Sequence, residues 1–385
     1  MMLGKKAQFC LFLCLVLSMP LLAGCWNRKE VNQIFFVSAG GIEKKENKVR
    51  LTIQFLRPKE KEQQKKESSA ITLTTQGETI FEALRLLNLR VSRKGFWSHA
   101  YAIVLSEEIA KEGILPYLDL FRRDHEMRQD MVLIITDKPE QLLRSVPNIE
   151  MVLARELKDS MKGGSKFAGI PVFSTLHEVA KMLYSKSPYA AITHVTVDEK
   201  SKKFRIDGVS FFQKDRMVGT FKEKDVSGWH WLTGDIKSTI ITLPCDKQKK
   251  TAAANLSIEI IRATSKLEVI RENRRLTLKV KVKAQSNVGE NGCKSDLKKE
   301  EEFLRLGKLT SDKVGKIIEH MFDYAQKTIK TDVFGFGSVY YQQYPKSWKT
   351  IKPDWNELFS NAEKEIEVDV KVIGSGLIFS EKIGE

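Results

Sequence analysis

One thiol near the start of the chain is placed for a specific reaction. Cys25 follows Leu22, Ala23 and Gly24 directly after a short apolar stretch. Small residues let a signal peptidase bind the backbone at this point, and the thiol that follows can be alkylated by a diacylglycerol group. The quartet resembles the bacterial lipobox. It therefore predicts signal cleavage between Gly24 and Cys25 and a lipid attached to Cys25.

The same leader could instead be a membrane-spanning helix, but it is too short for that role. Its apolar stretch covers residues 9–23 and is broken by Ser18 and Pro20. A spanning helix needs roughly 20 apolar residues. Residues 1–24 are therefore predicted to be a lipoprotein signal peptide, and the rest of the chain is expected to be exported and lipid-anchored.

Length and composition predict a globular protein of more than one domain. The 385 residues become 361 once residues 1–24 are removed, which exceeds one typical core. Hydrophobic content of 42% and charged content of 29% are ordinary for folded proteins. The net charge of +15 falls to +13 without Lys5 and Lys6. An exported basic protein meets anionic lipids and wall polymers and not nucleic acid, although the excess lysine can equally be a solvated face.

The cysteines fit an exported protein but do not define a disulfide framework. Cys10 and Cys14 would leave with the signal peptide, and Cys25 would carry the lipid. Only Cys245 and Cys293 remain. These two could pair, and two unpaired structural cysteines are an equal alternative.

No pattern of catalytic or metal-binding residues is complete. His177 and Glu178 begin a zinc-helix pattern, but Lys181 occupies the position of the required second histidine. No Gly-x-Ser-x-Gly nucleophile elbow occurs. The sequence therefore predicts no enzyme, no cofactor and no metal site. Four histidines are expected to have no catalytic role: His99, His125, His177 and His230.

Two glycine-containing segments also lack the spacing of a ligand site. Residues 163–166 resemble part of a phosphate loop without its earlier glycine or its Gly-Lys-Ser/Thr order. Gly335-Phe336-Gly337 is an isolated Gly-x-Gly, which is more typical of a tight turn.

In the first half, strands alternate with helices, which predicts a sheet covered by helices. The expected strands are 34–42, 49–56, 99–105, 131–136 and 190–197, the first two forming a hairpin across 43–48. The expected helices are 80–91, 149–161, 175–184 and two short helices that share the range 107–123. Residues 74–77 are expected to lead into the helix 80–91. Residues 59–69 lack apolar anchors and are expected to be a mobile loop.

In the second half, two strands have one apolar face and one charged face. The apolar side chains of one are Leu276, Leu278, Val280 and Val282, alternating with a row that includes Lys279, Lys281 and Lys283. Ile366, Val368, Val370 and Val372 alternate with charged residues in the same way. A helix over 314–329, with Thr310 and Ser311 as candidate N-caps, carries a matching apolar stripe.

These elements predict an α+β fold with two or three mixed domains. The first domain, 25–200, is expected to be a sheet flanked by helices. The polar residues 198–203 are the expected boundary, and the second domain, 205–374, is expected to be an antiparallel sheet carrying a long helix.

The order of several short segments resembles the Ger(x)C spore germination lipoproteins, the C subunits of nutrient germinant receptors. The likeness covers nearly the whole chain. It rests on residues 25–30, 40–42, 77–84, 98–100, 106–114, 121–124, 208–212, 217–219, 228–232, 330–337, 345–348 and 355–359.

The resemblance implies a partner protein and not an enzyme. Members of this family are tethered to the outer leaflet of the spore inner membrane and assemble with two integral membrane subunits that together answer small nutrients. Whether the C subunit itself binds a small molecule is left open. The rival interpretation is a solute-binding lipoprotein of a transporter, which would usually show two doubly wound lobes of parallel strands.

Four tryptophans are candidate anchors for a partner: Trp229, Trp231, Trp348 and Trp355. Large aromatic side chains dominate binding energy when they are buried between proteins. The alternative is that they pack inside their own domain.

Overall fold

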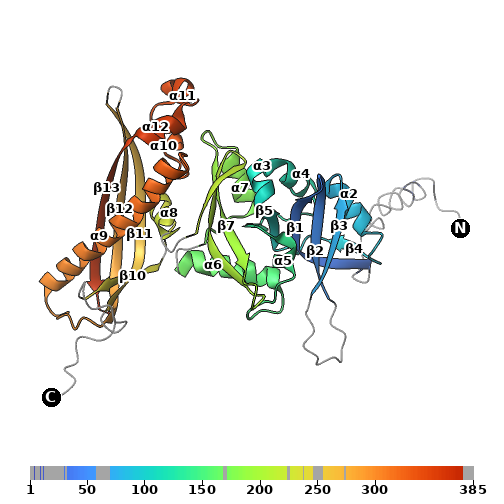
Figure 1. Ribbon diagram of the computed structural model, residues 1–385, viewed down its shortest axis with the longest axis horizontal. Coiled ribbons are helices and arrows are strands. Elements are labelled where there is room, and N and C mark those ends of the chain that lie inside the picture. The colour runs from blue at the N-terminus through green and yellow to red at the C-terminus, as the bar shows by residue number, and fades with distance from the viewer. Residues whose placement is uncertain are drawn as a thin grey trace, which may run out of the picture.

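The protein is an elongated molecule built on two β-sheets that follow one another along its long axis (Figure 1). The computed structural model describes residues 4, 9, 12, 30, 33–57, 70–167, 171–222, 226–236, 238–245, 255–272 and 275–375. Strands from the start of the chain lie at one end, and the last long helix and strand lie at the other. The two sheets with their helices confirm the α+β class.

The first sheet has nine strands in the order β3-β2-β1-β5-β6-β7-β8-β9, with β4 paired to β1. Its central strands β1, β5, β6 and β7 run parallel, and antiparallel pairs extend it on both sides. The bounds are β1 Ile34–Lys45, β2 Lys48–Leu56, β3 Ala70–Gly77, β4 Lys94–Phe96, β5 Ala102–Ser106, β6 Val132–Thr136, β7 Tyr189–Val197, β8 Phe204–Gln213 and β9 Arg216–Phe221.

Helices cover both faces of this sheet, as the sequence predicts. Every residue of β5 and β6 is buried, which is typical of parallel strands enclosed on two sides. One face packs against α2 Ile80–Leu87, α3 Glu107–Glu112, α4 Leu115–Arg123 and α7 Leu176–Leu183. The other packs against α5 Pro139–Leu143 and α6 Leu153–Phe167.

The predicted first hairpin is confirmed, but its turn is tighter than expected. β1 and β2 extend to Lys45 and Lys48, so only Glu46 and Asn47 connect them, with φ of 51° and 62°. Positive φ at both turn residues matches the right-handed twist of the paired strands. Residues 74–77, which were expected to lead into a helix, lie in β3. The helix α2 is instead capped by Thr79, whose side chain accepts a hydrogen bond from the Glu82 amide.

The second sheet has the order β10-β11-β12-β13. Its bounds are β10 Thr239–Pro244, β11 Asn255–Glu272, β12 Arg275–Asn291 and β13 Glu363–Gly374. The expected all-antiparallel pattern is wrong for one pair, because β12 and β13 run parallel. A long helical connection returns the chain to the end of the sheet where β12 began. The connecting elements are α9 Glu300–Asp323, the π-helical turn η3 Tyr324–Thr328, α10 Phe336–Gln343, α11 Pro345–Ile351 and α12 Trp355–Asn361.

The long helix α9 runs along one face of this sheet (Figure 1) and begins earlier than the sequence predicts. Thr310 and Ser311, the candidate N-caps, lie inside it and donate hydrogen bonds to the carbonyls of Leu306 and Gly307. These internal bonds satisfy both hydroxyls without ending the helix. Any Cβ on Gly307 would lie 2.7 Å from the Val370 carbonyl oxygen, so the glycine permits close packing of α9 on β13.

The first sheet continues through the expected domain boundary. Residues 198–203 form the turn between β7 and β8, in which the Asp198 carboxylate accepts from the Ser201 amide at 2.7 Å. The polar run is therefore a hairpin turn, and the bounds 25–200 and 205–374 separate two strands that pair with each other. The division into domains 25–200 and 205–374 remains a proposal, with the pairing of β7 and β8 crossing it.

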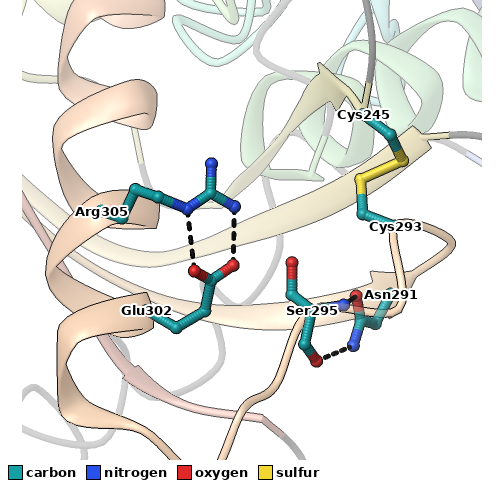
Figure 2. The surroundings of a disulfide bond; sticks show 6 residues. All are labelled: Cys245, Asn291, Cys293, Ser295, Glu302 and Arg305. Carbon is teal, nitrogen blue, oxygen red and sulfur yellow. Dashed lines mark hydrogen bonds and ion pairs between the residues drawn. A yellow bond between two sulfur atoms is a disulfide. The ribbon is translucent and has the colours of Figure 1, made fainter.

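Cys245, at the end of β10, and Cys293, just after β12, form a disulfide with an S–S distance of 2.08 Å (Figure 2). Asn291 braces the following turn, because its side chain both donates to the Ser295 carbonyl and accepts from the Ser295 amide. Such a bond is typical of an oxidising, extracytoplasmic compartment.

Replacing both Cys245 and Cys293 with serine is expected to lower the free energy of unfolding by roughly 3–4 kcal/mol, because the bond closes a long loop in the unfolded chain. The two cysteines are 48 residues apart. Urea denaturation with and without reductant would measure the loss. The double variant should no longer respond to reductant, and an unresponsive parent protein would contradict the bond.

Candidate functional site

The four tryptophans proposed as partner anchors lie in the core of the chain itself. Their exposed fractions are 5% for Trp229, 1% for Trp231, 4% for Trp348 and 4% for Trp355. The Trp229 indole donates to the Val333 carbonyl at 3.0 Å, and Trp348 packs edge-on against Trp355. This burial favours the alternative, in which these side chains pack within their own half of the chain, over a role as partner anchors.

A buried carboxylate, Asp332, organises the turn beside this aromatic cluster. The side chain is 3% exposed. It accepts hydrogen bonds from four consecutive amides, those of residues 334–337, at 2.6–3.2 Å. The Trp355 indole donates to Asp332 Oδ2 at 2.9 Å. Five N–H donors thus satisfy a buried charge and fix the start of α10.

The predicted tight turn at Gly335-Phe336-Gly337 is confirmed, and both of its glycines are required. Gly335 has φ of 93°, a left-handed conformation that favours glycine. A Cβ on Gly335 would lie 2.9 Å from the Tyr189 hydroxyl, and one on Gly337 would lie 2.8 Å from the Trp355 indole nitrogen. Burial, with the nearby Asp332 charge, raises the pKa of Tyr189 to about 12. The turn therefore packs directly against β7 of the first sheet.

A second buried polar cluster centres on His194, a residue for which the sequence predicts no role. The side chain is fully buried; its Nδ1 lies 2.7 Å from Asp207 Oδ1, and its Nε2 lies 3.0 Å from Glu107 Oε1. Burial opposes ionisation of Asp207, yet the hydrogen bond and charge of His194 lower the pKa of that carboxyl. For Glu107, burial is likewise outweighed, here by Lys111 and His194, and the pKa is lowered.

The His194 cluster resembles a structural hydrogen-bonded cross-link more than a catalytic site. Both ring nitrogens face carboxylates, so neither is free to take a proton from a nucleophile. Within the part of the chain that the structure describes, no hydroxyl or thiol is hydrogen-bonded to this ring. The cluster ties α3 to β7 and β8. Glu107 lies 87 positions before His194, so no local motif could have signalled the cluster.

The other histidines show no shared site. His99 and His177 are exposed, and His125 is 86% exposed at its side chain. His230 is buried, with Nδ1 3.5 Å from Asp235 Oδ2. Among the described residues, no group of three or more His, Cys, Asp or Glu side chains could hold a metal ion.

A charged pocket of about 530 Å³ opens beside α5. Arg50 pairs with Glu43 at 3.4 Å and also with Glu140, while Arg144 Nε donates to Glu140 at 2.9 Å. Burial raises the pKa of Glu43 despite Arg50. Because carboxylates inside the pocket already bind these guanidinium groups, an anionic ligand would have to compete with them.

Gly24 and Cys25, the predicted cleavage and lipidation residues, lie outside the described residues, as does the segment 59–69 expected to be a loop. Across the described ranges, no helix is both long enough and apolar enough to cross a membrane.

Comparison with known proteins matches the chain to two consecutive domains. Residues 27–197 match "Spore germination protein N-terminal domain", and residues 207–376 match "Spore germination B3/ GerAC like, C-terminal".

Similar proteins of Bacillus subtilis (strain 168) match over nearly their whole length. Spore germination protein KC is 24% identical, covering 93% of this chain and 92% of that protein. Spore germination protein B3 is 22% identical, covering 93% and 95%. The crystal structure of the GerBC protein has the same fold, with a TM-score of 0.58, 18% identity, and coverage of 87% of this chain and 96% of that one.

Proposed function

Because this chain belongs to the Ger(x)C family of spore germination proteins, we propose that it is the C subunit of a nutrient germinant receptor. In this role it is held at the outer face of the spore inner membrane by a lipid on Cys25. It acts with two integral membrane subunits to trigger germination, and it is not an enzyme.

The main support is that two spore germination domains match in order and together cover nearly everything after Cys25. The disulfide adds support, because it favours a location outside the cytoplasm. The buried clusters at Asp332 and His194 stabilise contacts between elements, which suits a structural and interacting role.

The alternative, a solute-binding lipoprotein of a transporter, is not favoured. That class usually has two doubly wound lobes of parallel strands. Here antiparallel pairs flank the parallel centre of the first sheet, and the second sheet has four strands, of which one pair is parallel, with α9 on one face.

Co-purification tests the proposed function. The tagged protein, isolated from detergent-solubilised spore membranes, is expected to bring down two integral membrane subunits in a fixed ratio. Recovery of a transporter permease in their place would support the solute-binding alternative and contradict the receptor role.

Cys25→Ala is expected to leave uncleaved precursor or protein released from the membrane fraction. Burial of acyl chains contributes about 0.8 kcal/mol per methylene group, and two chains anchor stably, whereas basic residues add roughly 1 kcal/mol each and are screened by salt. Cell fractionation with a high-salt wash would measure the effect. Cys10→Ala, in the predicted signal peptide, is the matched control. Mature Cys25→Ala protein that stays bound through the wash would contradict lipid anchoring.

A further inference from the structure

One end of the first sheet carries exposed apolar and basic side chains together on α2 and the turn after it. The exposed fractions are 51% for Phe81, 41% for Leu86 and 82% for Leu89. Arg85 and Arg90 are exposed among them, and the Arg85 guanidinium lies over the Phe81 ring at 4.9 Å. These five residues are called the α2 patch. Three large apolar side chains are thus exposed within one short helix and the turn that follows it, and grouped exposed apolar side chains mark interaction sites.

The patch lies where the chain enters the first sheet. Ile34, the first residue of β1, pairs with Lys94 of β4, which follows the patch by only a few residues. Figure 1 shows α2 beside β3 at the end of the molecule formed by the first strands. Cys25 lies nine residues before Ile34. An extended chain of that length reaches about 30 Å at most. A lipid on Cys25 would therefore keep this end close to the headgroups.

The charge of the patch suits an anionic surface. Two nearby carboxylates are already paired, Glu78 with Lys48 at 3.0 Å and Glu126 with Lys94 at 3.0 Å. Glu82 accepts from the Glu78 amide at 2.6 Å within the helix cap. Arg85 and Arg90 have no carboxylate partner in the described part of the chain; Arg90 donates to the Thr74 carbonyl at 3.1 Å. Apolar side chains flanked by arginine are the composition of an interfacial membrane contact.

We propose that the α2 patch docks on the anionic lipid surface next to the Cys25 anchor, so that the molecule stands on its first-sheet end and holds its second sheet away from the bilayer. The proposal rests on the anchored location given under Proposed function. It adds a defined orientation to a tether that alone would leave the protein free to rotate.

Vesicle sedimentation of the mature chain carrying Cys25→Ser tests the docking without the lipid. Vesicles of phosphatidylglycerol and phosphatidylcholine in equal parts are expected to bind the protein, and phosphatidylcholine alone to bind it far less. Arg85→Gln with Arg90→Gln should weaken binding about fivefold for each charge removed. Phe81→Ser with Leu89→Ser should also weaken it. Lys346→Gln with Lys349→Gln, on exposed positions of α11, is the matched control and should change nothing.

Equal binding by the patch variants and the parent chain would overturn the proposal. So would a protein that ignores lipid vesicles yet binds membranes containing the two receptor subunits, because the patch would then face a protein. The protein in the vesicle assay carries no lipid, so the two experiments are independent. If it does not bind vesicles, lipid anchoring through Cys25 is unaffected. If the Cys25→Ala fractionation contradicts lipid anchoring, the vesicle assay still measures whether the α2 patch binds lipid.

Discussion

Val370→Lys is expected to lower the free energy of unfolding by several kcal/mol, whereas Asp369→Lys, its neighbour, should be nearly neutral. Val370 is 3% exposed and faces α9, where its amide donates to the Ser311 hydroxyl at 2.9 Å. Lysine there would place an unpaired charge in the contact between helix and sheet. Asp369 lies exposed on the opposite face of the same strand.

Urea or thermal denaturation of the full chain would measure both variants. The full chain is the correct material because β8 pairs with β7, so a segment cut at residue 205 would lose its neighbouring strand. Val370→Ala leaves a cavity without adding a charge, so it should lower the free energy of unfolding by less than Val370→Lys does. The difference between the two variants separates the cost of the charge from the cost of lost packing. Similar losses for Val370→Lys and Asp369→Lys would mean that the two faces of β13 had been misassigned.

The alternation of apolar and charged residues along β12 and β13 could be predicted from sequence. Successive side chains of a strand point to opposite faces, so a strand with one buried face has a period of two. The charged face of the second sheet illustrates this: Lys279 lies in register with Glu365 and pairs with both Glu365 and Glu367 at 2.5 Å. The direction of β13 could not be read in the same way. An alternating strand has the same pattern in parallel and antiparallel pairs, and only the path of the connection decides between them.

Short and polar elements were also hidden from sequence. β3 ends with the polar or small residues Thr74, Thr75, Gln76 and Gly77, and β4 has only three residues. Neither strand therefore has a clear apolar period. The start of α9 carries three glutamates, which suit a first helical turn but bury nothing. The predicted helix began at Val314 and missed Leu306, which is also buried and lies earlier in α9.

Buried polar centres were the least predictable feature, because their partners come from distant parts of the chain. His194 meets Glu107 across 87 positions. Asp332 is different, since four of its five donors follow it within five residues. An aspartate just before a Gly-x-Gly turn is a local signal for such a centre.

Asp332→Ala is expected to lower the free energy of unfolding by about 3–5 kcal/mol or more. It would leave four amides and the Trp355 indole buried without an acceptor, and each unsatisfied group costs about 1–3 kcal/mol. Neighbouring groups can relax to recover part of this loss. Asp332→Asn should also destabilise, because an amide group oriented to keep the Oδ1 contacts would turn its own N–H donors toward the Gly337 amide and the indole.

Asp354→Asn, the same change at an exposed position beside α12, is the matched control and should be nearly neutral. Urea denaturation followed by tryptophan fluorescence would report global stability, with Trp355 as one of the six tryptophans that contribute to the signal. If the carboxylate is needed for its charge and its two acceptor oxygens, the free energy of unfolding of Asp332→Asn must be clearly lower than that of the parent protein. An Asp332→Asn protein as stable as the parent would show that a single acceptor oxygen is enough to hold the turn, and the junction between α10 and β7 would then depend on packing of the two glycines alone.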